Sequence, residues 1–359
     1  MAEGFEVRSS TGGYRVRWNT FGEKEYQDLF RTHRVAVVDK NVWDIYGGDR
    51  NTLGALDPDR VIIQEAEEEL KTVDTSVLIC ERLLELGFRR GQTLLAIGGG
   101  TIQDIVTFSA SILFRGVPWV FVPTTLLAQA DSCLGGKSSL NLKHWKNQLG
   151  NFYPPREIYI APEFLKTLNN DDFRSGLGEI IKVHFLSGPE MVRKISKVYK
   201  RLSVGSNELT EAIKDSLEAK ARIVEADEFD QGQRLILNYG HSFGHALETA
   251  TDFRVPHGIA VLLGVDMANY VGWKMGRIKA EDYERLREIV GFHLRDTDLA
   301  GVNVEIFFRA LRHDKKNREG EYSFILPSGT GIVEKVFVPM NTDTDGIIEG
   351  YLSLKKGGI

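Results

Sequence analysis

The chain of 359 residues lacks the features that mark several large classes of protein. It has only two cysteines, Cys80 and Cys133, which excludes a scaffold built on disulfides and indicates a reducing compartment. No apolar run reaches the length of about 18 residues that a membrane span requires, and the first residues, MAEGFEVRSS, lack the apolar core of a secretion signal. We therefore expect a cytoplasmic protein without a membrane partner.

A basic block is also missing from the sequence. The net charge is -5, so nucleic acid is not an expected partner, and any anion site must be built locally from selected Lys and Arg. Apolar residues make up 42% and charged residues 26%, a balance typical of globular proteins. The length suggests two domains or one large one.

The first half of the chain alternates short apolar runs with helical periodicity. Strands are predicted at 35–39, 61–63, 94–99, 119–123 and 158–161, and helices at 73–88 and 101–114. This alternation is typical of a parallel α/β sheet. We expect residues 1–170 to form an α/β nucleotide-binding domain.

From about residue 171 long amphipathic segments dominate, after the run NNDD interrupts the earlier pattern. Strand signal returns only at 321–326 and 332–338. Residues 171–359 are therefore expected to form a second, mostly α-helical domain. Its predicted helices cover 176–187, 190–203, 207–227, 234–250, 258–276, 280–293 and 303–313.

A glycine triplet, Gly98 to Gly100, stands between a predicted strand and a predicted helix. A backbone without Cβ atoms can approach a phosphate, and a helix N-terminus supplies free N–H groups. The triplet indicates either a dinucleotide site or a tight turn, since the G-x-G-x-x-G fingerprint is not matched. Asp39 and Asn41 follow an earlier strand and could hydrogen-bond a ribose or adenine.

Four polar residues, Arg234, Asn238, His241 and His245, recur at offsets of 0, 4, 7 and 11. On one helix they would share a narrow side, where a packing helix carries Leu and Val. This stripe is cationic and proton-active. It predicts contact with a metal, an anionic substrate or both.

Two members of the stripe, His241 and His245, have the i, i+4 spacing that can place two imidazoles on one ion. Glu179 and His257 are further candidates, and spacing alone does not say which three of the four would bind. The alternative is that two of these histidines are structural.

Basic and amide side chains in polar or glycine-rich contexts predict an anion site: Arg115, Lys137, Lys146, Asn147 and Arg234. The segment Gly135-Gly136-Lys137 resembles an anion-binding loop, although the P-loop motif is absent. Lysines such as Lys146 could equally be solvated surface charges. Together the patterns predict an enzyme that uses a dinucleotide and a divalent metal on a phosphorylated small molecule.

Six motifs resemble the dehydroquinate synthase family of sugar phosphate cyclases: GGGTIQD, PTTLLAQADSCLGGKSSLN, GLGEIIK, KARIVEADE, LNYGHSFGHALE and VPHGIAV. They occur in the family's order across about residues 35–317. The resemblance implies a two-domain homodimer that requires NAD+ and a divalent metal, zinc or cobalt. It also implies conversion of 3-deoxy-D-arabino-heptulosonate 7-phosphate, a phosphorylated sugar acid, to 3-dehydroquinate and phosphate.

The same resemblance implies roles for individual residues. The metal ligands would be Glu179, His241 and His257. Catalytic positions would be Lys137, Asn147, Lys182, Arg234, Asn238 and His245. Substrate contacts would come from Arg115, Asp131, Lys220 and Lys315, with Lys316 as a competing choice for Lys315. NAD contacts would come from Asp39, Asn41, Glu68, Lys71, Gly99, Gly100, Asp104, Thr124, Thr125, Lys146 and Thr167.

Several segments depart from the commonest pattern of this family. The segment KSSLNLKHWKN lacks the usual Pro and Gly before Lys-Asn, and TLNNDDF occurs where TLPxREF is usual. GLGE replaces the usual GxAE, and HGIAV lacks the acidic residue of the common HGEAV. These departures leave open the alternative that the protein is a related cyclase of secondary metabolism, of the aminodehydroquinate, valiolone or deoxyinosose type. Retention of GGK, Asn238 and His245 favours a dehydroquinate-type substrate.

Two other functional classes fit the sequence less well than a cyclase does. A polyol dehydrogenase of the glycerol dehydrogenase type has no phosphate to bind, so the set of Lys137, Asn147 and Arg234 argues against it. The third class is a binding protein without catalytic activity. Retention of Glu179, His241 and His257 argues against it, because burying a carboxylate and imidazoles without a metal to pair them is costly.

Overall fold

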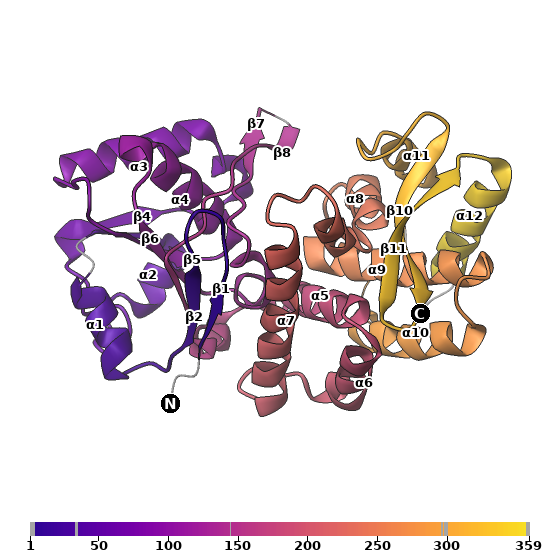
Figure 1. Cartoon of the computed structure of the whole chain (residues 1–359), viewed down its shortest axis with the longest axis horizontal. Helices are drawn as coiled ribbons and strands as arrows, with labels where there is room; N and C mark the ends of the chain where they lie inside the picture. The colour runs from indigo at the N-terminus through magenta and orange to yellow at the C-terminus, as the bar shows by residue number, and fades with distance from the viewer. Residues whose placement is uncertain (1–3, 33–34, 144, 296, 298–300, 357–359) are drawn as a thin grey trace. The chain divides into compact units, whose positions relative to one another are not determined.

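The computed structural model describes residues 4–32, 35–143, 145–295, 297 and 301–356 (Figure 1). The chain divides into two compact units. Unit 1 comprises Met1–Leu168 together with Ala221–Phe229, and unit 2 comprises Asn169–Lys220 together with Asp230–Ile359.

Unit 1 is built on a seven-stranded sheet with the order β1-β2-β9-β6-β5-β3-β4. β1 pairs antiparallel with β2, and the other pairings in this sheet are parallel. The five predicted strands and the parallel α/β class are thereby confirmed. The strands are β1 (Phe5–Val7), β2 (Tyr14–Trp18), β3 (Val35–Asp39), β4 (Val61–Gln64), β5 (Leu94–Gly98), β6 (Trp119–Pro123) and β9 (Glu157–Ile160).

Helices and short turns complete unit 1. The α-helices are α1 (Lys24–Thr32), α2 (Lys40–Tyr46), α3 (Val73–Glu85) and α4 (Gly100–Ile112). A small antiparallel hairpin joins β7 (Leu140–Leu142) and β8 (Trp145–Leu149). Single turns occur at η1 (Pro58–Arg60), η2 (Glu68–Leu70), η3 (Leu113–Arg115), η4 (Ala128–Ser132) and η5 (Pro162–Thr167).

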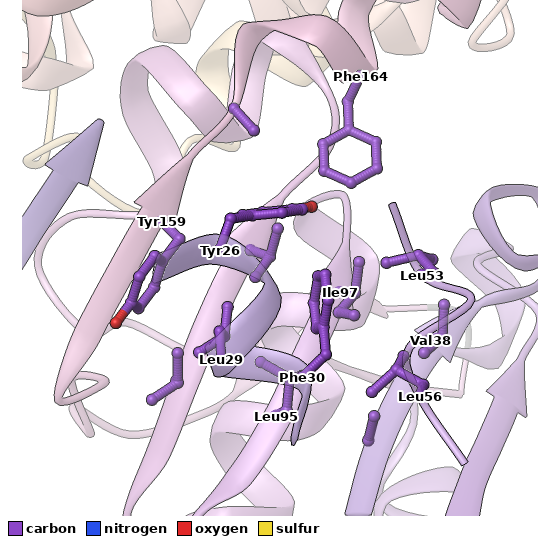
Figure 2. Packing of buried hydrophobic residues seen from close by; sticks show 14 residues of the cluster. Tyr26, Leu29, Phe30, Val38, Leu53, Leu56, Leu95, Ile97, Tyr159 and Phe164 are labelled. Carbon is purple, nitrogen blue, oxygen red and sulfur yellow. The ribbon is translucent and has the colours of Figure 1, made fainter. Parts of the chain in front are cut away.

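One hydrophobic core holds α1 against the sheet (Figure 2). Tyr26 and Phe30 of α1 form an edge-to-face pair with centroids 4.7 Å apart, and they belong to the same cluster as Val38 and Ile97 of the strands. Burying each such side chain stabilises the fold by roughly 1.5–3 kcal/mol. The core thus fixes the strands whose carboxyl ends carry the predicted cofactor residues.

The order of the strands creates a switch point between β3 and β5. After β3 the chain adds β4 on one side, and it then returns to add β5 on the other side. Open parallel sheets bind ligands outside the carboxyl ends of the strands at such a point. Gly99 and Gly100 of the glycine triplet follow β5 at this position, as the prediction of a dinucleotide site requires.

Unit 2 is mostly helical, as predicted. A central helix, α9, is buried continuously from Gly258 to Gly272, and α5, α8, α10, α12 and β10 pack against it. Among the described residues, no helix has both the length and the apolarity to span a bilayer. The helices are α5 (Asn170–Leu186), α6 (Pro189–Val198), α7 (Asn207–Ala226), α8 (His241–Ala250), α9 (His257–Lys274), α10 (Ala280–Leu294), α11 (Val304–Arg312) and α12 (Thr342–Lys356); β10 (Glu321–Gly329) pairs antiparallel with β11 (Ile332–Pro339), and short turns lie at η6 (Tyr199–Arg201) and η7 (Gln233–Asn238).

The prediction of one helix over 234–250 is wrong at its centre. η7 ends at Asn238 and α8 begins at His241, with Gly240 between them in the left-handed region at φ +80°. A Cβ on Gly240 would lie 2.6 Å from the carbonyl oxygen of Val261. Both the turn and the close approach of α9 require glycine here. The predicted stripe therefore divides into two pieces.

α5 and α9 approach each other through two glycines. A Cβ on Gly178 would lie 2.1 Å from the Gly258 carbonyl oxygen, and a Cβ on Gly258 would lie 2.0 Å from the Ser175 carbonyl oxygen. The backbone N–H of Gly258 donates to Ser175 Oγ at 2.8 Å, which supplies an acceptor that the first turn of α9 lacks. This contact holds His257, the first residue of α9, beside α5.

We predict that Gly178→Ala destabilises unit 2. The new methyl group would meet backbone rather than a flexible side chain, and overpacking costs about 1–3 kcal/mol or more. The apparent midpoint of thermal unfolding should fall by about 2–4 °C for each kcal/mol.

Gly346→Ala is the matched control, because Gly346 also lies in a helix and a Cβ there would have nothing within 4 Å. It should leave the midpoint unchanged or raise it, since Ala favours a helix over Gly by about 0.5–1 kcal/mol. Equal midpoints for the two variants would contradict the packing argument.

Candidate active site

Three residues predicted as metal ligands converge in unit 2. Glu179 lies within α5, His241 begins α8 and His257 begins α9. Glu179 Oε1 is 3.9 Å from His241 Nε2 and 3.7 Å from His257 Nε2. One ligand atom from each residue lies within 4.8 Å of the others. Ligands at about 2.0–2.2 Å from a tetrahedral ion are separated by about 3.4 Å, so the three groups fit one zinc-like ion after a small contraction.

Both histidines have an acceptor for the nitrogen that faces away from Glu179. His241 Nδ1 is 3.3 Å from the Tyr239 carbonyl oxygen, and His257 Nδ1 is 3.2 Å from Glu248 Oε1. We assign the proton of each ring to Nδ1, since a donated Nδ1–H leaves the Nε2 lone pair for a metal. The geometry therefore selects the tautomer that a ligand needs.

The protonation of the two rings follows from their surroundings. Burial, assisted by the charge of Lys182, lowers the pKa of His241 well below its ordinary value. Desolvation by the surrounding protein also acts to lower the pKa of the half-exposed His257, but the hydrogen bond and the charge of Glu248, with the charge of Glu179, outweigh it, and the pKa is raised. His241 is thus a neutral imidazole, the form that binds metals.

Lys182 shares the interior of unit 2 with Glu179. The two residues are one turn apart on α5, both side chains are 2% exposed, and Lys182 Nζ forms an ion pair with Glu179 Oε2. A buried carboxylate needs such a partner to remain charged. Because Lys182 occupies Oε2, the other oxygen faces the two imidazoles.

His245 lies beside the three candidate ligands. Its possible metal-binding partners do not include Glu179. Its ring centroid is 5.5 Å from that of His241 and 5.9 Å from that of His257. It forms a second possible group with Glu248 and His257. Desolvation by surrounding protein lowers the pKa of His245 to about 4, although part of the residue is open to solvent. His245 is therefore neutral at neutral pH.

Lys316, one of the two lysines between which the sequence does not choose, acts electrostatically on the histidines. Its charge contributes to the lowered pKa of both His241 and His245. Lys316 Nζ is 3.1 Å from Asp314 Oδ2, which also accepts a hydrogen bond from Ser242 Oγ at 2.9 Å. Lys315 is exposed. The Asp314–Ser242 contact ties Lys316 to α8.

Two further cationic residues predicted for the substrate are buried in unit 2. The exposed fraction is 3% for Arg234 on η7 and 6% for Lys220 on α7. Asn238, also on η7, donates from Nδ2 to the Leu235 carbonyl at 3.2 Å. Arg234 and Asn238 lie on a 3-10 turn, so their spacing differs from the α-helical spacing expected for them.

A hydrogen-bonded network in unit 1 joins residues predicted for two different roles. Lys71 Nζ is 2.7 Å from Asn147 Oδ1 and 3.3 Å from both Glu68 Oε1 and Asp104 Oδ2. Asn141 connects the same groups, because its Nδ2 donates to Glu68 Oε1 at 3.0 Å and its Oδ1 accepts from the Asn147 backbone N–H at 2.9 Å. The network links three predicted NAD contacts with Asn147, which was predicted to be catalytic.

Asp104 is the most perturbed acid of this network. Burial raises its pKa to about 7, while the charge of Lys71 and two hydrogen bonds oppose the rise. One of these bonds comes from the backbone N–H of Ser139 at 2.9 Å. A buried carboxyl group whose pKa lies near neutral pH is typical of a functional site.

Predicted cofactor residues also surround the switch point of the sheet. Asp39 ends β3, and its Oδ1 accepts from the Asn41 backbone N–H at 2.8 Å. Gly99 is the N-cap residue of α4, and no side chain there accepts a hydrogen bond from the first N–H groups of the helix. A Cβ on Gly99 would lie 2.8 Å from Thr125 Cγ2, so the loops after β5 and β6 pack closely. This arrangement presents the N-terminus of α4, including Gly100, to a ligand.

Other predicted residues of unit 1 lie at the same carboxyl edge or on the hairpin. Thr124 follows β6 and donates its backbone N–H to the Gly98 carbonyl at 3.0 Å. Thr167, beyond β9, lies with Oγ1 3.0 Å from Tyr46 OH. Lys146 is exposed on β8, next to Asn147.

Arg115 is not brought together with these residues in unit 1. It lies on η3, between the end of α4 and the start of β6, whereas Thr124 follows the opposite end of β6. Asp131 lies in a π-helical turn after β6. Lys137 follows two glycines with positive φ, and its Nζ lies 5.9 Å from the ring centre of Phe152.

Several residues that contact these sites had no role predicted from the sequence, and four of them contribute side-chain contacts to the metal site or to the network of Lys71: Ser242, Asn141, Glu248 and Asp314. A signal existed for Glu248, which is three residues after His245 and seven after His241, and so belongs to the same side of α8. The other three contribute through contacts between segments that are distant in the chain, which no local pattern indicates.

The chain belongs to the 3-dehydroquinate synthase family. Residues 60–175 match the family model of the N-terminal part of 3-dehydroquinate synthase, and residues 176–317 match that of the C-terminal part. A 3-dehydroquinate synthase of Campylobacter curvus is 39% identical over 74% of this chain and 76% of its own length. One from Helicobacter pylori is 37% identical over 79% of this chain and 82% of its own length.

Solved structures of sugar phosphate cyclases share the fold. A 2-epi-5-epi-valiolone synthase from Streptomyces hygroscopicus, with NAD+ and Zn2+ bound, is 24% identical, with a TM-score of 0.83 over 99% of this chain and 98% of its own. A 2-deoxy-scyllo-inosose synthase complexed with carbaglucose-6-phosphate, NAD+ and Co2+ is also 24% identical, with a TM-score of 0.84 over 99% of this chain and 100% of its own. These likenesses confirm the two-domain fold expected from the motifs.

Proposed function

We propose that this protein is an enzyme of the 3-dehydroquinate synthase type. It converts 3-deoxy-D-arabino-heptulosonate 7-phosphate to 3-dehydroquinate and phosphate through a transient oxidation, phosphate elimination, reduction and ring closure. The observation that carries the proposal is the convergence of Glu179, His241 and His257 from three helices, in a member of this family. The proposal assigns cofactor binding to residues 1–170 and metal and substrate binding to residues 171–359.

Glu179, His241 and His257 would hold a divalent ion, zinc or cobalt. One carboxylate and two imidazoles are a donor set that suits these metals and leaves a position for substrate. When bound, the ion polarises substrate oxygens and stabilises the negative charge that develops on them. Lys182 would hold one oxygen of Glu179, and the acceptors of the two Nδ1–H groups would keep the rings in place.

The residues around the switch point would hold NAD+. The N-terminus of α4 suits a pyrophosphate, because Gly99 and Gly100 leave its N–H groups accessible. Asp39 lies where a carboxylate can accept hydrogen bonds from a ribose. NAD+ held there would supply reversible hydride transfer, so no net NADH should form.

The cationic side chains would bind the two anionic groups of the substrate. Lys182, Lys220 and Arg234 are buried in unit 2, and the charge of Lys316 acts on His241 and His245. Buried cations form stronger hydrogen bonds to phosphate and carboxylate than exposed ones do, since water competes less. Lys137 and Asn147 in unit 1 and Asn238 in unit 2 stay proposed catalytic residues. Arg115 and Asp131 stay proposed substrate contacts.

His245 is the proposed acid–base residue. Its lowered pKa keeps the imidazole neutral, so that it can accept a proton from the substrate and return it later. The nearby carboxylate of Glu248 would stabilise the imidazolium formed in between, because the two groups belong to one cluster.

A related cyclase of secondary metabolism is the second candidate. The departures in KSSLNLKHWKN and TLNNDDF favour it, because they change segments next to predicted substrate and cofactor residues. An aminated heptulosonate, sedoheptulose 7-phosphate or glucose 6-phosphate would be the corresponding substrates. A polyol dehydrogenase is a weaker candidate, since its substrate has no phosphate for Lys137, Asn147 and Arg234 to bind. Homodimer formation and a cytoplasmic location stay predictions.

We predict that the protein, supplied with NAD+ and Zn2+ or Co2+, releases inorganic phosphate from the heptulosonate phosphate without accumulating NADH. Phosphate is measured colorimetrically and NADH by its absorbance at about 340 nm, while the three alternative sugar phosphates and glycerol serve as parallel substrates. Preference for another sugar phosphate would support the second candidate. NADH accumulation with glycerol and no phosphate release would contradict the proposal.

We also predict that Lys316→Ala and Lys315→Ala differ strongly in their effect on turnover. Loss of a charge-assisted hydrogen bond of about 1.5–3 kcal/mol should lower kcat/KM for Lys316→Ala by roughly 10- to 150-fold. The neighbouring Lys315→Ala is the matched control, and its kcat/KM should stay within about twofold of wild type because Lys315 is exposed. The reverse order would assign the substrate contact to Lys315.

A further inference from the structure

We infer that Glu248 is a positioning residue that holds the His257 ring in the tautomer and orientation that offer Nε2 to the metal. The inference rests on the proposed metal site and adds to it a carboxylate that does not touch the ion. It concerns metal affinity first and turnover only as a consequence.

The two nitrogens of His257 face two different carboxylates. Nδ1 is 3.2 Å from Glu248 Oε1, and Nε2 is 3.7 Å from Glu179 Oε1. Glu248 and Glu179 fall into different candidate groups, which share only His257. Glu248 therefore lies on the side of the ring opposite the proposed ion. It accepts the Nδ1–H proton, so the lone pair of the ring is placed on Nε2.

His257 needs such a partner more than His241 does. The His257 side chain is 42% exposed, whereas that of His241 is 15% exposed. His241 Nδ1 meets the backbone carbonyl of Tyr239, two residues earlier in the same turn. His257 begins a helix and finds its acceptor on another one. Without Glu248, a half-exposed imidazole could rotate and exchange tautomers, and binding a metal would have to stop both.

The backbone holds Glu248 at a fixed position relative to His257. A Cβ on Gly264 of α9 would lie 2.0 Å from the Gly240 carbonyl oxygen, so α8 and α9 are in close contact. The Phe253 backbone N–H donates to the Glu248 carbonyl at 2.8 Å and ties the connecting loop to the end of α8. The Glu248 side chain is 13% exposed, which shields its hydrogen bond from water.

A second metal on His245, Glu248 and His257 is the competing interpretation of the same contacts. It would require His257 to lose its remaining ring proton and bridge two ions. A hydrogen bond requires neither step, so we favour the positioning role. The number of ions bound to each chain separates the two.

The experiment measures Zn2+ and Co2+ binding to full-length protein that has been stripped of metal, by competition with a chromophoric chelator. Wild type should bind one ion per chain. Glu248→Ala should raise the Kd by about 10- to 100-fold, and Glu248→Gln should raise it less, because an amide oxygen still accepts the Nδ1–H proton. Glu349→Gln, on an exposed position of α12, is the matched control and should leave the Kd unchanged.

A spectroscopic measurement distinguishes positioning from a general loss of structure. In the Co2+-loaded protein, the Nδ1–H protons of the two ligated rings should give two exchangeable, strongly shifted proton resonances. Glu248→Ala should lose the His257 resonance through exchange with solvent and keep the His241 resonance, whose acceptor is the backbone. The unfolding midpoint of the metal-free variant should equal that of metal-free wild type.

Three outcomes would overturn the inference. An unchanged Kd in Glu248→Ala, with one ion bound to wild type, would remove the positioning role and leave the proposed metal site standing. Two ions per wild-type chain, one of them lost in Glu248→Ala, would establish the second metal instead. No binding of Zn2+ or Co2+ by wild type would remove the metal site itself, and the proposed function with it.

Discussion

Close contact between helix backbones is the constraint on which the candidate metal site depends. Gly178 and Gly258 bring α5 against the first turn of α9, and Gly240 and Gly264 bring α8 against the same helix. A methyl group at any of these four positions would meet a carbonyl oxygen within 2.6 Å. Side chains on helices held this close can share one ion, so the glycines help to set the distances among Glu179, His241 and His257.

Glu179, Lys182 and the two histidines of the candidate metal site each contact a defined partner. Lys182 pairs with one oxygen of Glu179, while the other oxygen faces the imidazoles. The outer nitrogens of His241 and His257 meet a carbonyl and a carboxylate. Because unpaired groups in such an environment are costly, this arrangement limits rotation of the side chains before any ligand arrives. The site is preorganised, which is what metal binding and charge stabilisation require.

The sequence predicted the elements whose periodicity is strong. The buried strands β3, β5 and β6 are continuous apolar runs, and α9 and α10 match their predicted ranges within one or two residues. Motifs that resemble the family also identified the set of Glu179, His241 and His257, which spacing alone had left ambiguous. Here the structure adds distances and the orientation of each ring.

Sequence reasoning failed where a tertiary contact overrides a local pattern. The helix expected over 234–250 is interrupted at Gly240, because α9 passes too close for a helical backbone with a side chain there. Asp314 contacts both Lys316 and Ser242, and the Ser242–Asp314 contact spans 72 residues of the chain, so no local pattern indicates it. Segment Ala221–Phe229 belongs to unit 1 although its neighbours on both sides belong to unit 2, which composition does not reveal.

X-ray absorption at the metal edge of the Co2+-loaded protein tests the central claim most directly, because it reads the ligands rather than activity. The account predicts a first shell of nitrogen and oxygen at about 2.0–2.2 Å, with multiple scattering from two imidazoles in wild type and from one in His257→Ala. A first shell that contains sulfur, or the same two imidazoles in wild type and in His257→Ala, would contradict the assignment of Glu179, His241 and His257 as the metal ligands.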